Sequence, residues 1–136
     1  MSQKENEIIL SVCLTCNFNG YENSNKCAGK KLAHKLSDKF KKITNVTLRG
    51  VNCMSNCKRS CIVSLTAENC FTYVFGDIDP KNSDYINPLQ ELLLTYSKSE
   101  DGFLRRRHRP EIYRSNIVGR FPAINSKSNI IINLKK

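Results

Sequence analysis

This sequence of 136 residues has no tryptophan, only two histidines, four prolines and six glycines. Nothing in that composition indicates a collagen or a coiled coil, and no glycine-rich phosphate loop is present. Long apolar runs are also absent: residues 8–14, interrupted by Ser11, are far too few to cross a membrane. The first seven residues carry acids and no small-residue cleavage site, which predicts that there is no signal peptide. We therefore expect a cytoplasmic protein that does not insert into membranes.

The two histidines do not indicate a catalytic site. His34 falls within a predicted helix and His108 within a run of arginines, and neither is near a cysteine motif in the sequence. We expect both at the surface. The chain shows no other catalytic constellation, so we favour a binding or carrier protein over an enzyme and leave enzymatic activity open.

Acidic residues are outnumbered, because 22 lysines and arginines against 12 aspartates and glutamates give a net charge of +10 at pH 7. A basic stripe of this kind attracts nucleic acid or an acidic protein. The stripe lacks the interleaved aromatic residues that stack on bases, which disfavours nucleic acid. We expect either a solvated face or a docking face for an acidic protein partner, formed by Arg105, Arg106, Arg107 and Arg109, with Arg114 and Arg120 nearby and Asp101 and Glu111 as local acids.

The seven cysteines are the most informative residues of the chain. Cys13-x-x-Cys16 follows one apolar run, and Cys53-x-x-x-Cys57-x-x-x-Cys61 follows another. In a reducing cytosol, clustered cysteines bind metal or perform redox chemistry more often than they form structural disulfides. Thiolates are soft ligands, and four of them suit zinc or an iron–sulfur cluster.

The spacing of apolar residues predicts a strand at residues 7–13, a loop at 17–27, a helix at 29–43 and a second strand at 46–52. A strand, a helix and a strand in this order form a βαβ unit, whose strands are parallel neighbours. Their carboxyl ends meet at one edge of the sheet. Cys13 and Cys53 stand at those ends, so we expect both cysteine motifs at the same edge.

Two short strands at residues 62–66 and 71–75 then form a hairpin, and a helix follows from about residue 82 or 87 to 97. Pro88 would suit the first helical position. This order predicts an α/β, thioredoxin-like domain over residues 1–101, with a four-stranded mixed sheet and helices on both faces. Residues 102–136 form a basic C-terminal extension with a short helix from Pro110, and its tail adds a strand, packs on a partner or is disordered.

Cys13, Cys53 and Cys57 are the strongest candidate ligands, because a tight loop around Ser55 and Asn56 directs backbone amides at bound sulfur. Cys16 is our first choice as the fourth ligand, with Cys27 and Cys61 as alternatives. We expect Cys70, at the tip of the hairpin, to be incidental. Free cysteines also occur as small core residues, but two spaced clusters at adjacent strand ends disfavour that interpretation here.

A thiol–disulfide enzyme is a further alternative, because Cys-x-x-Cys after a strand is typical of thioredoxins. Two features argue against it. The helix of a thioredoxin begins at the motif, where its dipole lowers the thiol pKa, whereas a loop separates Cys16 from the predicted helix here. Thioredoxins also place a proline before the third strand, and residues 57–62 contain none.

The segment from Val51 to Val63 resembles the second cysteine motif of thioredoxin-like 2Fe–2S ferredoxins and of the small iron–sulfur subunit of respiratory NADH dehydrogenase. The resemblance implies that Cys53 and Cys57 are cluster ligands. In those proteins the first pair is separated by more residues than Cys13 and Cys16 are.

The chain is also similar to a family of short bacterial proteins of unknown function that are expected to bind metal. The motifs that carry this similarity extend through Tyr73-Val74-Phe75-Gly76-Asp77 and Arg109-Pro110-Glu111 to Arg120-Phe121-Pro122. The resemblance implies a cysteine-bound metal and an association with cobalt or cobalamin genes.

Together these features predict a protein that binds a 2Fe–2S cluster through Cys13, Cys16, Cys53 and Cys57 and exchanges single electrons with a partner. A protein that holds zinc or handles another metal, including a cobalt- or cobalamin-related one, is the first alternative. A thiol–disulfide oxidoreductase is the second. The expected partner is a redox or metal-handling protein.

Overall fold

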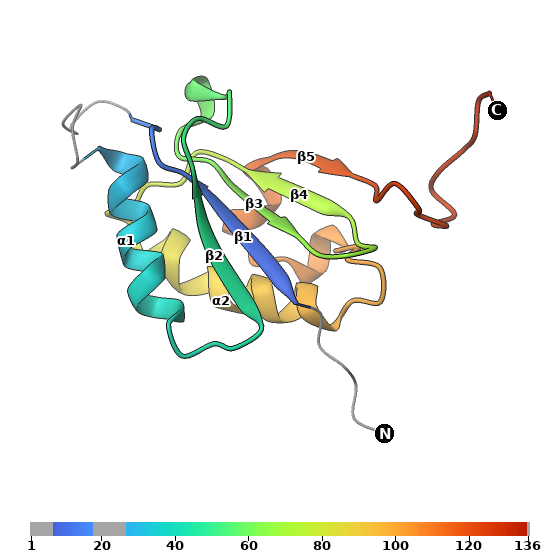
Figure 1. The fold of residues 1–136 in the computed structure, drawn as a ribbon, viewed down its shortest axis with the longest axis horizontal. Coiled ribbons are helices and arrows are strands. Elements are labelled where there is room, and N and C mark those ends of the chain that lie inside the picture. Colours follow the sequence, from blue (N-terminus) through green and yellow to red (C-terminus); the bar gives the residue numbers. More distant parts are fainter. Residues whose placement is uncertain (1–6, 18–26, 136) are drawn as a thin grey trace.

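A five-stranded mixed sheet forms the centre of the computed structural model, which describes residues 7–17 and 27–135 (Figure 1). Its strands lie in the order β2-β1-β3-β4-β5. β1 is parallel to β2, and the remaining neighbours are antiparallel. The strand bounds are β1 Ile8–Cys13, β2 Val46–Val51, β3 Val63–Thr66, β4 Thr72–Phe75 and β5 Ile117–Phe121. The predicted βαβ unit, the hairpin and the mixed sheet are confirmed. Most of the loop predicted at residues 17–27 lies outside the described residues.

Two long helices follow the predicted pattern of apolar residues. α1 spans Ala28–Phe40 and buries Leu32, Leu36 and Phe40 at four-residue steps. α2 spans Ser83–Lys98, and the side chain of Asn82 accepts a hydrogen bond from the amide of Asp84 at 2.9 Å. This cap satisfies a free amide of the first turn, so the helix begins here. Pro88 consequently lies inside α2 and is not its first residue. The short helical segments are η1 Cys57–Arg59, η2 Arg106–His108 and α3 Ile112–Ser115.

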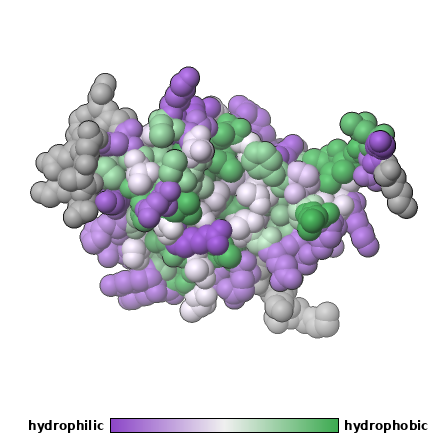
Figure 2. Space-filling model, turned by 45° about the horizontal axis from the view of Figure 1, so that its top comes forward, coloured by the Kyte–Doolittle hydropathy of each residue, from purple (hydrophilic) through white to green (hydrophobic). Residues whose placement is uncertain are grey.

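The sheet has five strands, not the predicted four. The additional strand, β5, comes from the predicted C-terminal extension and pairs with β4 through Tyr73 and Arg120. The division of the chain after residue 101 stays a prediction, although the strand that ends the sheet lies beyond it. After β5, residues 122–135 contain no helix or strand. Several of their apolar side chains are exposed, among them Ile124, Ile132 and Leu134, and apolar surface continues along the projecting tail in Figure 2.

The helices pack on one face of the sheet, which corrects the prediction of helices on both faces. Leu10, Leu65 and Tyr73 are paired across β1, β3 and β4, so they share a face, and they lie in one buried cluster with the apolar residues of α1 and α2. Each fully buried leucine contributes about 2 kcal/mol to such a core. The long segment between β2 and β3 forms only the short η1, so no crossover helix covers the other face.

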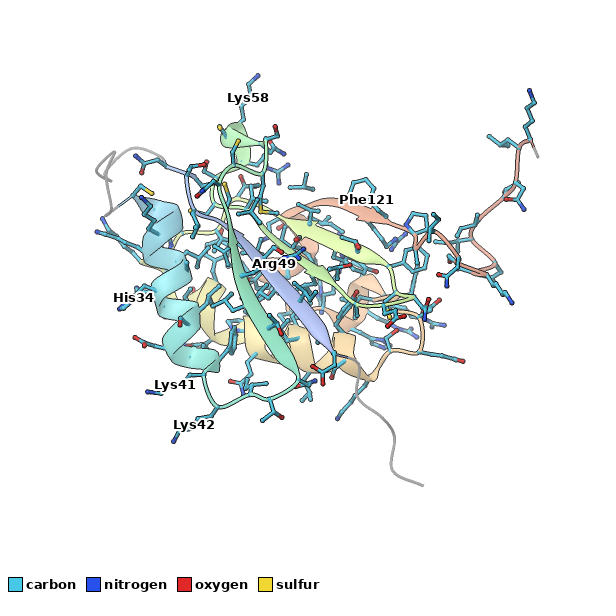
Figure 3. All side chains as sticks on the ribbon, viewed as in Figure 1. His34, Lys41, Lys42, Arg49, Lys58 and Phe121 are labelled. Carbon is cyan, nitrogen blue, oxygen red and sulfur yellow. The ribbon has the colours of Figure 1, made fainter. Side chains whose placement is uncertain are left out.

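That other face is polar in its centre. Ser11 is paired with Arg49 of β2 and with Ser64 of β3. The exposed Arg49 lies on the sheet in Figure 3 and donates a hydrogen bond from Nε to Ser11 Oγ at 2.7 Å. This bond gives a buried hydroxyl a partner. Within the described residues, no helix is long and apolar enough to span a bilayer.

Candidate metal centre

The carboxyl ends of β1 and β2 place the two cysteine motifs at one edge of the sheet. Cys13, the last residue of β1, is in register with Val51, the last residue of β2. The amide of Leu14 donates to the carbonyl oxygen of Val51 at 2.8 Å, and the amide of Cys53 donates to that same oxygen at 3.0 Å. The backbones that follow the two strands therefore start from neighbouring positions, as the parallel pairing predicted.

The thiols of Cys13 and Cys16 interact directly at this edge, and both side chains are buried. Burial alone would raise the pKa of Cys13, but hydrogen bonds from Cys16, from the amide of Met54 and from Thr15 outweigh it and lower that pKa. The Sγ of Cys13 lies 3.7 Å from Oγ1 of Thr15. For Cys16, burial and the neighbouring Cys13 raise the pKa to about 11. One sulfur of the pair is thus stabilised as a thiolate and the other as a thiol.

The segment that carries the second motif folds over this pair. Ser60 and the amide of Ile62 lie near the Cys16 sulfur and oppose the rise of its pKa, and the Ser60 hydroxyl donates to the Cys57 carbonyl oxygen at 2.7 Å. Cys61 is fully buried, and burial, followed by the charges of Cys16, Cys13 and Cys27, raises its pKa. Its peptide bond to Ser60 is cis. Cys61 thus lies close enough to the Cys13–Cys16 pair to interact with it electrostatically.

Cys53 and Cys57 occupy a different position, because both thiols are exposed. The backbone of Cys53 has a φ of 85° and that of Ser55 a φ of 63°, in the left-handed region that residues with a Cβ seldom adopt. Residues 7–17 and 27–135 contain no group of three or more cysteine, histidine or acidic side chains arranged to hold a metal ion. The structure therefore brings Cys13 and Cys16 together and does not bring Cys53 and Cys57 to them, so their assignment as ligands stays a prediction.

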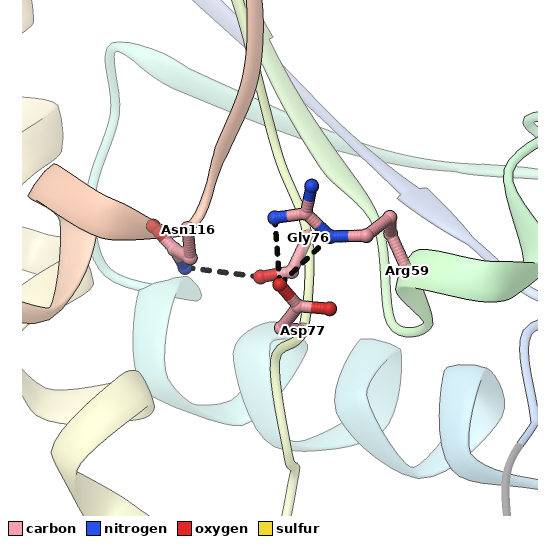
Figure 4. A network of polar contacts seen from close by, with 4 residues as sticks. All are labelled: Arg59, Gly76, Asp77 and Asn116. Atoms are coloured by element: carbon pink, nitrogen blue, oxygen red, sulfur yellow. Dashed lines mark hydrogen bonds and ion pairs between the residues drawn. The ribbon is translucent and has the colours of Figure 1, made fainter.

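We call residues 52–62 the cysteine loop, and Arg59 links this loop to the chain after β4 (Figure 4). Its guanidinium contacts Oδ2 of Asp77 through Nε at 2.8 Å and Nη2 at 2.6 Å. The amide of Asp77 donates to the Arg59 carbonyl oxygen at 2.6 Å. Beside it, Asn116 Nδ2 donates to the carbonyl oxygen of Gly76 at 3.0 Å. The sequence analysis missed this role of Arg59 and Asp77, because a contact across 18 residues leaves no periodic signal.

Cys27 lies beside the first cysteine motif, whereas Cys70 lies apart from both motifs. Cys27 directly precedes α1, and its thiol donates to the carbonyl oxygen of Leu14 at 3.1 Å. Cys70 is buried at the β3–β4 hairpin, and burial followed by the charge of Asp101 raises its pKa. Val63 pairs with Val12 near the end of β1, so the hairpin lies at the opposite end of the sheet.

The donors at this edge fit a thiolate-bound metal centre in their chemistry. Sulfur comes from Cys13 and Cys16, and the amides of Thr15, Met54 and Ile62 point at it. Amide hydrogen bonds of this kind lower the cost of negative charge on metal-bound sulfur. Thr15, Met54, Ser60 and Ile62 were not predicted as site residues, and their only sequence signal is their place beside the cysteines.

A solved structure, the thioredoxin-like [2Fe–2S] ferredoxin from Aquifex aeolicus, is similar to this chain with 12% identity and a TM-score of 0.48. The similarity covers 70% of this chain and 93% of the ferredoxin chain. No curated protein matches the sequence. A family profile described as "Protein of unknown function (DUF1636)" matches residues 10–123. Because that match spans most of the sequence, this chain belongs to the DUF1636 family.

Proposed function

We propose that this protein holds a 2Fe–2S cluster through Cys13, Cys16, Cys53 and Cys57 and exchanges single electrons with a protein partner. The observation that carries the proposal is the buried Cys13–Cys16 pair, whose sulfurs receive hydrogen bonds from the backbone of the second cysteine motif. When bound, such a cluster supplies one-electron redox chemistry. The amide of Met54 would offset the added negative charge on Cys13.

Cys53 and Cys57 would complete the set from the loop. The amide of Met54 contacts Cys13, and Cys53 directly precedes Met54 in the chain, so Cys53 lies near the buried pair. Cys53 and Ser55 have left-handed backbone conformations, which are unfavourable for residues with a Cβ and are often found in functional loops. A four-thiolate site requires the exposed sulfurs of Cys53 and Cys57 to turn toward Cys13.

The position of the site suits a carrier. Burial of Cys13 and Cys16 shields one side of the proposed site from water. Cys53 and Cys57, on its other side, lie on an exposed loop that a partner can approach. Lys58 projects from this loop in Figure 3, and it offers an acidic partner a complementary charge. We place the protein in the cytoplasm, where a reducing environment keeps such thiols free.

Spectroscopy of the full chain purified without oxygen tests the cluster. We expect a brown protein containing iron and acid-labile sulfide in equal amounts, whose visible absorption bleaches on reduction and gives way to an electron paramagnetic resonance signal. Ferric–thiolate charge transfer produces the colour, and zinc produces none. A colourless protein that holds stoichiometric zinc after anaerobic reconstitution would exclude the cluster.

Single serine substitutions test the ligands. Cys13→Ser, Cys53→Ser and Cys57→Ser should each lose bound iron, whereas Cys70→Ser, at the opposite end of the sheet, should retain it. Full iron retention in Cys57→Ser would remove the exposed loop from the site. The same measurement on Cys16→Ser identifies the fourth ligand.

A zinc or other metal-handling site is the second candidate, and one observation favours it. Cys61 is buried, and the charges of Cys16, Cys13 and Cys27 act on its thiol, so these four sulfurs would have to move together to form a site without the exposed loop. Structural zinc sites are closed and have four ligands. Loss of zinc in both Cys27→Ser and Cys61→Ser, with retention in Cys57→Ser, would support this site, and the same pattern with cobalt would support a role in handling cobalt.

A thiol–disulfide oxidoreductase is supported by the opposite pKa shifts of the Cys13–Cys16 pair. A nucleophilic cysteine needs a lowered pKa, as Cys13 has, and a protonated partner, as Cys16 has. Mass spectrometry of metal-free protein in a glutathione redox series would detect a reversible Cys13–Cys16 disulfide. Its absence across the series would exclude this activity.

A further inference from the structure

A cluster of arginines forms a second feature of the surface, separate from the thiols. Four of them line a shallow pocket of about 400 Å³, and among the described residues no other residue type contributes to its lining. The pocket residues are Arg105, Arg106, Arg107 and Arg114. They come from η2 with the residue before it, and from α3. We call this set the arginine pocket.

Backbone carbonyl groups hold part of the arginine pocket in place. Arg114 donates from Nε to the Arg109 carbonyl oxygen at 2.9 Å and from Nη2 to that of Arg107 at 3.2 Å. Arg106 donates from Nη1 to the Arg114 carbonyl oxygen at 3.0 Å. These acceptors are neutral, so they order the guanidinium groups without cancelling their charge. A ligand that binds here meets side chains already in position, which reduces the entropy that binding would lose.

No carboxylate neutralises the arginine pocket in the described part of the chain. The ion pairs seen there join His34 to Asp38 and Arg59 to Asp77, and neither includes a pocket residue. Four guanidinium groups around one hollow repel one another, and the repulsion falls when an anion lies between them. The local charge is therefore complementary to a ligand with more than one negative charge.

Arg109, whose carbonyl oxygen accepts from Arg114, adds a buried cation next to this cluster. It is 5% exposed, and within the described residues its Nε and Nη1 have no hydrogen-bond partner. Burial lowers its pKa most; Tyr73 opposes this change, and the charges of Arg106, Arg120 and Arg114 lower the pKa further. A buried charge without a counter-ion is unfavourable, and a nearby anion would offset part of that penalty.

We propose that the arginine pocket binds a compact oxyanion of the phosphate type that carries several negative charges, such as a pyrophosphate group. The planar guanidinium fork matches the spacing of phosphate oxygens and forms paired hydrogen bonds with them. The described part of the lining contains no aromatic ring, so the pocket recognises the charged group and not a base stacked beside it. The site is independent of the metal centre.

Calorimetric titration of the full chain with inorganic pyrophosphate tests the site. The key variant is Arg105→Gln with Arg107→Gln. The hydrogen bonds that order the pocket are donated by the side chains of Arg106 and Arg114 to backbone carbonyl groups, so among the described residues this double substitution removes none of them. The matched control is Lys41→Gln with Lys42→Gln, which removes the same charge at the end of α1 (Figure 3). We expect one pyrophosphate per chain and about tenfold or greater weakening in the arginine variant only.

A second variant separates geometry from charge. Arg114→Lys keeps the positive charge and removes the fork, so it should also weaken pyrophosphate binding. Circular dichroism and the melting temperature establish that each variant is folded. Adenosine diphosphate and the free phosphate ion, titrated in parallel, distinguish a nucleotide source from an inorganic one.

Three results would overturn the proposal. The wild-type chain could fail to bind pyrophosphate at millimolar concentration. The lysine control could lose as much affinity as the arginine variant, which would mean diffuse attraction. An acidic peptide or duplex DNA could bind at physiological salt and depend on the same arginines while pyrophosphate does not, which would make the cluster a docking face for a macromolecule.

Discussion

The thiol of Cys27 donates a hydrogen bond to the carbonyl oxygen of Leu14 at 3.1 Å. This contact joins the residue before α1 to the turn between Cys13 and Cys16. A second contact reinforces it, because the amide of Gly29 donates to the Cys16 carbonyl oxygen at 2.9 Å. The start of the helix and the first cysteine motif therefore form one structural unit, and a change in one is expected to move the other.

Substitution of Cys27 separates its structural contact from a role as a ligand. Cys27→Ser keeps a donor, so we expect near-wild-type stability, whereas Cys27→Ala should lower the free energy of unfolding by about 1 kcal/mol. Urea unfolding measures both variants. If Cys27→Ser folds normally but loses the metal, Cys27 is a ligand and the proposed four-cysteine set is incorrect.

Gly29 has no room for a side chain. A Cβ added there would lie 2.1 Å from the carbonyl oxygen of Cys13, so Gly29→Ala must push α1 away from the end of β1. We expect a loss of about 3 kcal/mol in stability and a marked loss of bound metal. Thermal unfolding and metal analysis provide the measurements. Lys31→Ala, at an exposed position of α1, is the control and should leave both unchanged.

The Arg59–Asp77 ion pair is expected to hold the cysteine loop more than it stabilises the whole fold. Exposed pairs contribute little to global stability, and salt screens them. Arg59→Gln should therefore leave the melting temperature almost unchanged but speed the loss of metal to a chelator, most clearly at low salt. Lys58→Gln removes the neighbouring charge, which forms no ion pair with any described residue, and should leave that rate unaltered. Equal rates in wild-type and Arg59→Gln proteins would argue against a holding role.

Tyr113 predicts how stability depends on alkaline pH. Burial, followed by the charge of Tyr85, raises the pKa of Tyr113, and its hydroxyl donates to the Tyr85 carbonyl oxygen at 2.6 Å. Above about pH 10 the unfolded chain releases this proton while the folded chain keeps it, so stability is full below that pH and falls as the pH rises.

The variant Tyr113→Phe should lose about 1 kcal/mol near neutral pH and show a shallower alkaline decline than wild type. Denaturant unfolding between pH 8 and about pH 11 measures that slope. Ile86→Val removes a buried methyl group within α2 without changing a titratable group, and its slope should equal the wild-type slope. A wild-type slope in Tyr113→Phe would show that another group governs the decline.

Local patterns in the sequence were sufficient to predict the βαβ unit, the hairpin and the two long helices. Leu32 and Leu36 recur at helical spacing, and the run ending at Cys13 is apolar except at Ser11, which is typical of a largely buried strand. The same patterns failed for β5, which is short and has Gly119 in its middle. Pairing with β4 makes it a strand, and that partner lies more than 40 residues away.

The prediction of helices on both faces failed for a related reason. A thioredoxin-like strand order predicts a crossover helix between β2 and β3, on the face opposite α1. Residues 52–62 instead form the cysteine loop, whose only helical segment is η1. The exposed face instead pairs Ser11 with Arg49. A polar residue in β1 was a local sign of this arrangement, since a strand covered by helices on both sides would be apolar at that position.

The sequence alone determined that Cys13 and Cys53 meet at one edge of the sheet, because two strands joined by a helix are parallel and end together. It also determined that arginine is concentrated in one segment. Tertiary structure decided which groups face one another. The fold of residues 52–62 buries Cys61 beside the Cys13–Cys16 pair and leaves Cys53 and Cys57 exposed, because backbone turns and side-chain packing set those directions and spacing along the chain does not.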